Sequence, residues 1–209
     1  MTATAPLRQL FAGLRVLLAL TLVLGLAYPL AITGVAQIAA PGNANGSRVS
    51  TVANANGPGS EGGAGRVVGS DLVGQPFDGP QWFHPRPSAA GEDGYDTLAS
   101  GASNLGPNNP DLAAAVQERL TTYRAENGLS AGQRVPADAV TAGASGLDPD
   151  ISVENARLQS ARVARARSLA PAAVAKAVND ATKGRTLGIL GEPRVNVLRL
   201  NLALDRLRR

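Results

Sequence analysis

The clearest feature in the hydrophobic pattern is an uncharged run from Val16 to Ile38, VLLALTLVLGLAYPLAITGVAQI. At about 1.5 Å per residue, a helix of this length reaches roughly 35 Å, enough to cross a hydrocarbon core of about 30 Å. The pattern therefore predicts a single transmembrane helix over residues 16–38, surrounded by membrane lipid. Tyr28-Pro29 is a point where this helix could kink, which membrane helices tolerate when neighbouring groups satisfy the freed carbonyl.

The charges around this run predict its orientation. Arg8 and Arg15 precede it, and no Lys or Arg follows before Arg48. The positive-inside rule then places residues 1–15 in the cytoplasm and the rest of the chain outside it. A cleaved secretory signal, ending near Gly34–Ala36, is the alternative, but the run is longer than the usual signal core of about 7–15 residues.

A Gly/Asn-rich segment, residues 39–65, follows the predicted helix. It contains NANG twice and ends in GPGSEGGAG. Such a composition cannot bury enough apolar surface to order itself, so we expect a flexible linker, at least from about Thr51. The remaining residues, 66–209, are expected to form one domain.

Short apolar runs and helical repeats alternate in the first half of this domain. Arg66–Gly74 reads as a strand, and a proline-rich loop, Trp82–Pro110, follows it. Asn109-Pro110 is typical of a helix start, with Asn as the N-cap and Pro in the first position. That helix is expected to end at Asn127-Gly128. The apolar residues at helical spacing in it are Leu112, Val116, Leu120 and Tyr123.

The second half of the domain continues the alternation. A second Gly/Ser/Asp/Pro loop precedes Ser152, which can cap a helix running from Val153 to about Ser168. Pro171 opens a further helix, expected to end at Lys183-Gly184, and Thr186–Leu190 is typical of a buried strand. Residues 195–207 fit a strand or a helix equally well. The predicted fold class is a mixed α/β extracytoplasmic domain tethered to one transmembrane helix.

Composition argues against most catalytic chemistry in this domain. The chain has no cysteine, and its one histidine, His84, is more often structural than catalytic in such a setting. Clustered His or Cys ligands for a metal and a Walker-type phosphate loop are both missing from the sequence. The net charge is +4, but the arginines are scattered rather than interleaved with aromatic residues, so nucleic-acid binding is not expected. We predict no catalytic and no metal-binding residues.

Arg86 is the most specific feature of the loop Trp82–Pro110. Two prolines flank it and fix the backbone, so a planar guanidinium is aimed in one direction. Either this group pairs with a carboxylate of its own domain or it anchors a partner protein. The Gly-rich stretch Ser100–Pro110 could form an anion-binding nest, although a loop held by Asn and Ser side chains is the more frequent outcome.

Two further polar positions are open to more than one interpretation. Gln159 lies in an Arg-rich helix, where its amide could bind a nucleotide or a partner backbone, although a solvated helix face is more frequent. Asp148-Pro149 is most simply a turn.

Eight blocks in order give the chain a resemblance to a known family. They are YPL, NANGS, VGSDLVGQPF, WFHPRPSA, SGASNLGPNNPDL, VPADAVTAGASGLDPDIS, RVARARSL and GRTLGILGEPRVNVLRLNLALD. Together they resemble the C subunits of the Kdp potassium-transporting ATPases from about Leu17 to Leu207. The stretch from Thr51 to Gly65 looks longer than the usual connection of that family.

The resemblance implies a small accessory subunit of a bacterial inner-membrane complex. Its partners would be a channel-like potassium-binding subunit, a P-type ATPase subunit and a small single-helix subunit. This chain contains neither DKTG nor a TVGYG-like filter, in keeping with hydrolysis and ion selection by those partners. The family is described as a catalytic chaperone that raises the ATP affinity of the pump subunit. On that account ATP is the cofactor, and the nucleotide-binding positions are Gln159, Ser145, Gly146 and Asp148.

The predicted topology conflicts with direct ATP binding, because a domain outside the cytoplasm does not reach cytoplasmic ATP. We therefore favour a domain that clamps the extracytoplasmic mouth of the channel-like subunit through Trp82–Pro110, hereafter the docking loop. An independent membrane-anchored binding domain is the alternative. The predicted docking residues are Arg86, Pro87, Ser88, Ser103, Asn104, Gly106 and Asn109.

Overall fold

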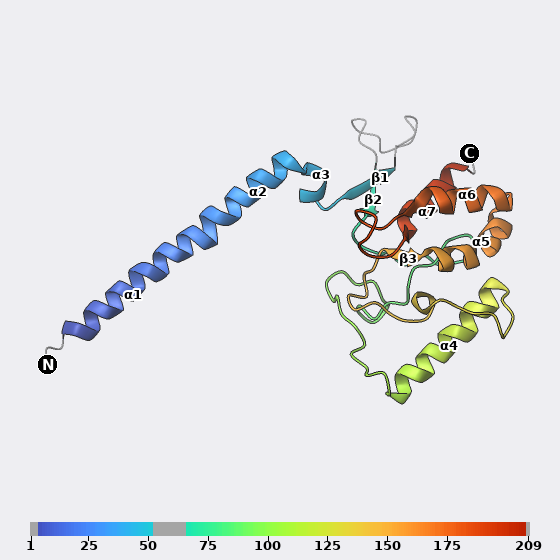
Figure 1. The fold of residues 1–209 in the computed structure, drawn as a ribbon, viewed down its shortest axis with the longest axis horizontal. Coiled ribbons are helices and arrows are strands. Elements are labelled where there is room, and N and C mark those ends of the chain that lie inside the picture. Colours follow the sequence, from blue (N-terminus) through green and yellow to red (C-terminus); the bar gives the residue numbers. More distant parts are fainter. Residues whose placement is uncertain (1–3, 52–65, 208–209) are drawn as a thin grey trace. The chain divides into compact units, whose positions relative to one another are not determined.

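A computed structural model describes residues 4–51 and 66–207 of the chain (Figure 1). The chain divides into two compact units, Met1–Ser47 and Arg48–Arg209. Each unit is described by itself below.

The first unit is a long apolar helix. It consists of α1 (Thr4–Leu22), a π-helical turn η1 (Val23–Ala27) and α2 (Tyr28–Ala39), and a short helix α3 (Pro41–Ala44) follows. Leu7–Ala39 is long and apolar enough to cross a membrane, and none of it is buried. The π-turn ends two residues before Pro29 and includes Gly25, whose carbonyl the ring of Pro29 would clash with in a regular helix. The predicted helix is present, and it begins earlier than residue 16.

The predicted linker 39–65 contains regular structure at its start. Besides α3, it includes strand β1 (Arg48–Thr51), which pairs antiparallel with β2 (Arg66–Ser70). The part expected to be most flexible, 52–65, lies outside the described residues. Because Thr51 is the register partner of Arg66, the two ends of that segment are held together. The length of residues 52–65 therefore adds no reach between helix and domain.

The rest of the second unit combines a small sheet with four longer helices. The sheet has the antiparallel order β3-β5-β4, made of Asp150–Ser152, Arg194–Asn196 and Thr182–Lys183 respectively. The helices are α4 (Pro110–Asn127), α5 (Val153–Arg167), α6 (Pro171–Ala181) and α7 (Val197–Leu207), with a 3-10 turn η2 at Ala137–Ala139. The mixed α/β class is confirmed.

The helix ends follow the predicted chemistry. Asn109 caps α4 by accepting a hydrogen bond from the backbone of Asp111, and Gly128 ends the helix in the left-handed conformation, φ 66°. Ser152 caps α5 through the backbone N–H of Asn155. Both predicted starts are therefore confirmed.

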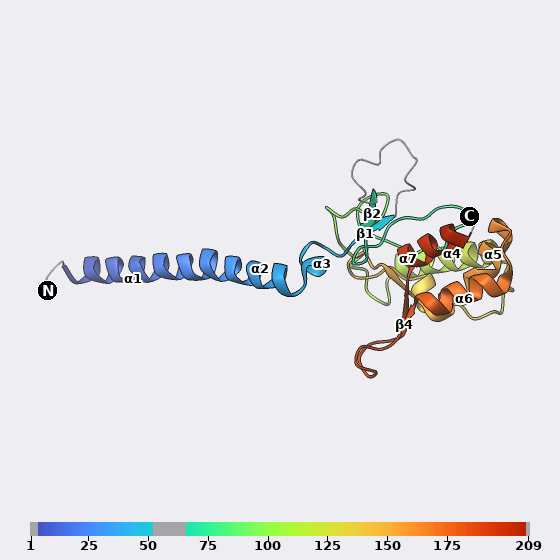
Figure 2. The same cartoon turned by 90° about the horizontal axis from the view of Figure 1, so that it is seen from above.

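Helices α5, α6 and α7 pack around β5 and enclose the main core, and Figure 2 shows them gathered on one side of the domain. This core is aliphatic apart from Phe83, as the scarcity of aromatic residues requires. A smaller cluster lies between α4 and η2 around Tyr123, Ala139 and Val140. The main core residues are Phe83, Ile151, Ala156, Val163, Ala164, Val174, Ala177, Val178, Val195, Val197, Leu200 and Leu204.

Two predictions for the C-terminal third need correction. Thr186–Leu190 is not a buried strand but the exposed tip of a hairpin, and α6 ends at Ala181 instead of Lys183-Gly184. The ambiguous segment 195–207 is strand to Asn196 and helix from Val197. In the helix, residues at 197, 200, 201 and 204 are buried, a spacing that places them on one helical face against the core.

The burial of α7 predicts that two leucine substitutions in this helix differ in their effect on the free energy of unfolding. Leu200→Ala should lower the free energy of unfolding by about 2–5 kcal/mol, because it removes a fully buried side chain and leaves a cavity. Leu207→Ala, at the half-exposed end of the same helix, should change it by no more than about 0.5 kcal/mol. Denaturant unfolding of the detergent-solubilised chain measures both. Equal effects would contradict the helical assignment of 197–207.

Candidate docking site

The start of the docking loop is an extended segment whose backbone is held by side chains instead of a neighbouring strand. The side-chain amide of Asn201 accepts from the N–H of Phe83 at 2.9 Å and donates to its carbonyl at 3.0 Å. The amide of Gln159 does the same for His84, at 2.7 and 3.0 Å. Two buried helical amides thus reproduce the hydrogen bonds that a sheet would otherwise supply.

Two arginines of α5 fix the residues just before this segment. Arg162 donates through Nη1 to the carbonyls of Pro80 at 2.8 Å and Trp82 at 2.9 Å. Arg167 donates to the carbonyl of Gln81 at 2.6 Å and lies over the ring of Trp82, 4.3 Å from its centroid. Burial lowers the pKa of Arg162 from its ordinary value, while the charge of Glu126 acts in the opposite direction. The guanidinium still donates from a protonated state, because the ordinary pKa is so high.

Gln159 is fully committed to these contacts. Its side chain is 1% exposed. Its oxygen accepts from His84 and from Arg162, and its nitrogen donates to His84 and to Asn155. The expectation of a solvated helix face is wrong, because residues on this face of α5 support the docking loop.

Next along the chain, the docking loop joins the loop Ser145–Pro149. Arg86 forms an ion pair with Asp148, with 2.9 Å between Nη1 and Oδ2, so the partner carboxylate belongs to its own domain. Ser88 donates through its hydroxyl to the carbonyl of Gly146 at 2.7 Å. Gly101 donates to the carbonyl of Ser145 at 3.0 Å. The predicted docking residues Arg86 and Ser88 are therefore in direct contact with Asp148 and Gly146, which the family resemblance had assigned to a nucleotide site.

Gly146 and Tyr95 show how closely the two loops fit. Gly146 is buried with φ +66°, and a Cβ there would lie 2.7 Å from the Cβ of Ala90. Tyr95 donates its hydroxyl to the carbonyl of Arg86 at 2.6 Å. Burial raises the pKa of Tyr95, and the charge of Asp148 raises it further, so this hydroxyl stays a neutral donor at physiological pH.

The outer part of the docking loop faces solvent. Leu98 is 97% exposed, and Ser103, Asn104 and Gly106 are exposed as well. Asn104 has φ 54°, a left-handed conformation that asparagine tolerates better than most residues. The hydroxyl of Ser103 accepts from Leu105 at 3.5 Å, and Asn109 belongs to the cap of α4. This stretch is a turn-rich loop of the kind predicted by its Ser and Asn content.

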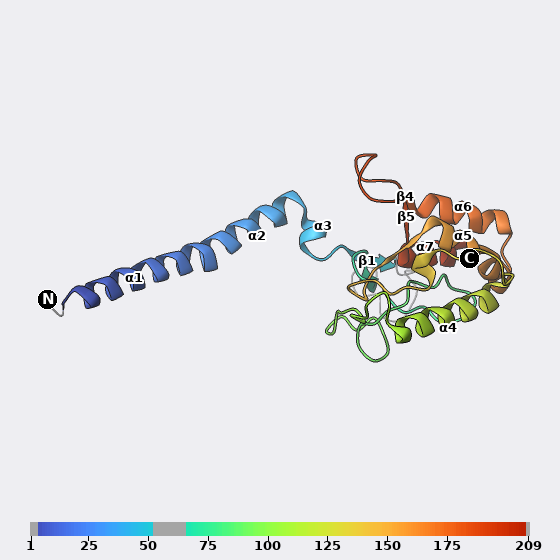
Figure 3. The same ribbon diagram turned by 60° about the horizontal axis from the view of Figure 1, so that its bottom comes forward.

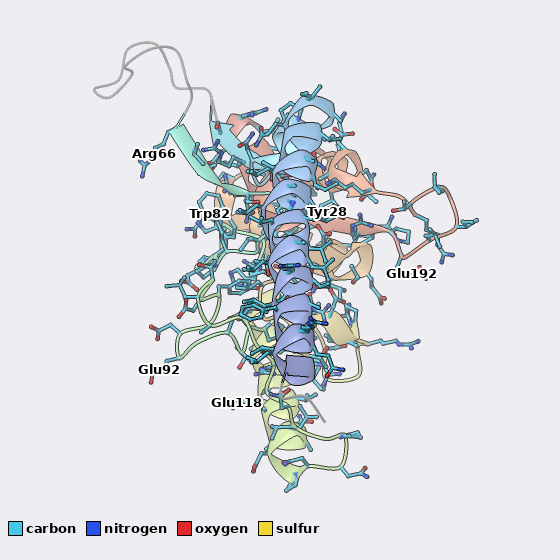
Figure 4. The ribbon with its side chains drawn as sticks, turned by 90° about the vertical axis from the view of Figure 1, so that its left-hand side faces the viewer. Tyr28, Arg66, Trp82, Glu92, Glu118 and Glu192 are labelled. Carbon is cyan, nitrogen blue, oxygen red and sulfur yellow. The ribbon has the colours of Figure 1, made fainter. Side chains whose placement is uncertain are left out.

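A cleft of about 490 Å³ separates the docking loop from α4. Arg86, Pro87 and Ser88 of the docking loop line this cleft, and so does Glu118 of α4. Figure 4 labels Glu118, and it also labels Glu92 on the docking loop. The charged residues of the lining are four carboxylates and two guanidiniums, so the cleft favours a cationic group. They are Asp78, Asp93, Glu118, Glu126, Arg86 and Arg119.

His84 belongs to this framework, and its contacts are with backbone groups, the amide of Gln159 and a carboxylate. Its Nε2 lies 2.9 Å from the carbonyl of Gly79, and its Nδ1 lies 3.5 Å from Glu126. Within residues 4–51 and 66–207, no group of three or more potential metal ligands occurs. These contacts fit a structural role for His84.

Sequence reasoning missed Asn201 and Tyr95. Asn201 interrupts the apolar stretch VLRLNLALD, and a lone amide among leucines was a usable signal of a buried polar contact. Tyr95 offered no local signal, because its partner, the backbone of Arg86, is identified by the loop geometry alone.

Comparison with known proteins identifies the family. The family model for KdpC, the K+-transporting ATPase c chain, matches residues 10–206. A potassium-transporting ATPase KdpC subunit from Mycobacterium bovis is 52% identical over 200 residues, which cover 96% of this chain and 99% of the relative. The chain belongs to the KdpC family. Proteins of the same name from Gemmatimonas aurantiaca and Nitratidesulfovibrio vulgaris are 53% and 54% identical, over 90% and 87% of this chain and 88% and 85% of those relatives.

Three of the four residues that the family resemblance assigned to ATP are engaged in contacts within the domain. The amide of Gln159 is buried and has all four of its hydrogen-bonding positions occupied. Gly146 is buried against Ala90, and Asp148 presents a carboxylate, which repels phosphate. We derive no nucleotide contact from these positions.

The contacts of Gln159 predict a structural phenotype for its substitution. Gln159→Ala should destabilise the domain by about 1–3 kcal/mol for each backbone group of His84 left unpaired in the interior. Gln117→Ala is the matched control, because Gln117 is exposed on α4. Thermal unfolding of the purified chain is the measurement, with ATP titration of each variant beside it. A fully stable Gln159→Ala protein that has lost measurable ATP binding would contradict this account and support the nucleotide role.

Proposed function

We propose that this chain is the accessory subunit of a potassium-transporting ATPase and that it docks on the other subunits through the docking loop. The observation that carries the proposal is the KdpC family match over residues 10–206, joined to a rigid but exposed loop. By family resemblance, the partners are the channel-like potassium-binding subunit, the P-type ATPase subunit and the small single-helix subunit. Leu7–Ala39 would anchor the chain in the bacterial inner membrane.

The charge distribution supports an extracytoplasmic domain. Arg8 and Arg15 lie at the N-terminal end of the apolar helix, and the next cationic residue is Arg48. The domain would then face the mouth of the channel-like subunit, where it clamps the assembly. An effect on ATP affinity would pass through contacts between subunits, because ATP is on the other side of the membrane.

The build of the docking loop supports a role in protein binding. Its inner half is fixed by Gln159, Asn201 and the Arg86–Asp148 pair, while its outer half stays exposed. A surface that is already ordered loses less conformational entropy when a partner covers it, by about 0.5–1.5 kcal/mol for each side chain held in advance. Arg86 serves docking indirectly, because it holds the loop in place. The acidic cleft beside it suits a basic side chain of the partner.

The proposed topology is testable because the chain has no cysteine. Ala175→Cys, on the exposed side of α6, should react in intact cells with a thiol reagent that does not cross the inner membrane. Thr2→Cys should react only after the cells are opened. Labelling yield by mass spectrometry is the measurement. The reverse pattern would place the domain in the cytoplasm and restore direct contact with ATP as the leading hypothesis.

The proposed docking surface predicts the effect of single exposed residues. Leu98→Ser should reduce co-purification of the other subunits, since truncating an interface anchor costs about 1–4 kcal/mol of binding free energy. Asn104→Gly keeps the left-handed backbone and removes only the side chain, so it tests contact without added strain.

Leu207→Ser, a half-exposed leucine on α7, is the control for the docking experiment. All three variants should keep the unfolding temperature of the original chain, because each changed side chain is exposed. Undiminished recovery of the partner subunits with both loop variants would remove the docking loop from the interface.

A further inference from the structure

The hairpin between β4 and β5 is a second exposed feature of the domain. Thr186 and Leu190 exchange backbone hydrogen bonds of 2.8 and 2.9 Å, and Gly188 donates to the carbonyl of Arg185 at 3.0 Å. The guanidinium of Arg185 donates to both carboxylate oxygens of Glu192, at 2.9 and 2.7 Å. Residues 184–193, hereafter the C-terminal hairpin, are therefore an ordered projection. Figures 2 and 3 show it standing away from the helices of the domain.

The tip of the C-terminal hairpin is apolar and exposed. Leu187, Ile189 and Leu190 are 85%, 74% and 57% exposed, and no charged residue lies between Arg185 and Glu192. Leu187 has φ 54°, a backbone conformation that glycine or asparagine adopts at lower free energy. Together with Ile189 and Leu190, this side chain forms an exposed apolar patch, a feature typical of surfaces that contact something outside their own chain.

The backbone of the tip is suited to an apolar surrounding. The N–H groups of Thr186, Gly188, Ile189 and Leu190 all donate within the hairpin. Polar backbone groups that are already paired can leave water without the cost of an unmade hydrogen bond. The bidentate pair of Arg185 with Glu192 likewise compensates the two charges nearest the tip.

The position of the hairpin in the chain favours the membrane surface as that surrounding. Only residues 40–47 separate the apolar helix from β1, so the domain begins within about 27 Å of the helix end even if they were fully extended. Exposed Lys183 adds a cationic side chain at the base of the hairpin, and cationic residues beside apolar ones are typical of segments that dip into the interface of anionic lipids. Three apolar side chains bind a bilayer weakly, but the transmembrane helix would raise their effective concentration at its surface.

We propose that the C-terminal hairpin inserts Leu187, Ile189 and Leu190 into the outer leaflet of the membrane that holds the chain. This second contact gives the domain a fixed tilt above the bilayer, in addition to its attachment through residues 40–47. The choice of the outer leaflet rests on the extracytoplasmic topology proposed above, whereas the insertion itself concerns the chain alone and does not depend on the docking loop or on the other subunits.

The test uses the full chain, without other subunits, in vesicles of phosphatidylethanolamine and phosphatidylglycerol. Ile189→Cys carries an environment-sensitive fluorophore, and the control is Ala175→Cys on the exposed side of α6. We expect a blue-shifted emission at 189 that is quenched by nitroxide-labelled acyl chains and protected from aqueous iodide. Position 175 should show the reverse. Replacing Leu187 and Leu190 by Ser should abolish the lipid quenching at 189 while the unfolding temperature stays unchanged.

Two results would overturn the proposal. Iodide quenching at 189 equal to that at 175, without quenching from the lipid, would show that the tip stays in water. A blue shift that arises only after the other subunits are added, without lipid quenching, would show that a protein surface covers the tip instead.

Discussion

The structure depends on the pairing of one extended backbone segment with buried side chains. After a turn at residues 79–82, Phe83 and His84 run on without a strand beside them, yet Phe83 is fully buried there. Gln159, Asn201, Arg162 and Arg167 supply the missing hydrogen bonds. An unpaired peptide group in such a place costs about 1–3 kcal/mol, so these polar residues are as necessary to the fold as the leucines around them.

This arrangement lets a loop be both exposed and well defined. The anchored segment leads directly to Arg86, whose ion pair with Asp148 ties it to the loop Ser145–Pro149. The outer residues, including Leu98, are then presented to solvent from a fixed base. An accessory subunit acts by binding its partners, and a surface that is ordered in advance lowers the entropy cost of that binding.

The C-terminal hairpin applies the same principle with a different chemistry. Four N–H groups of its tip donate within the hairpin and Arg185 pairs with Glu192, so the side chains exposed at the tip are mainly aliphatic. The docking loop, by contrast, presents mainly Ser, Asn, Gly and acidic residues. The two projections therefore differ in chemistry, which is the reason we propose a protein surface for the docking loop and a lipid surface for the C-terminal hairpin.

The sequence by itself determined the apolar helix, the caps of α4 and α5, the α/β class and the family, because each depends on a run or a short motif of neighbouring residues. Only the tertiary structure decided that Arg86 pairs within the domain, that Gln159 is buried and that Thr186–Leu190 is exposed. Residues 195–207 show the reason most plainly. Their leucines satisfy both periodicities, and the choice between strand and helix came from which face the core of α5 and α6 could bury.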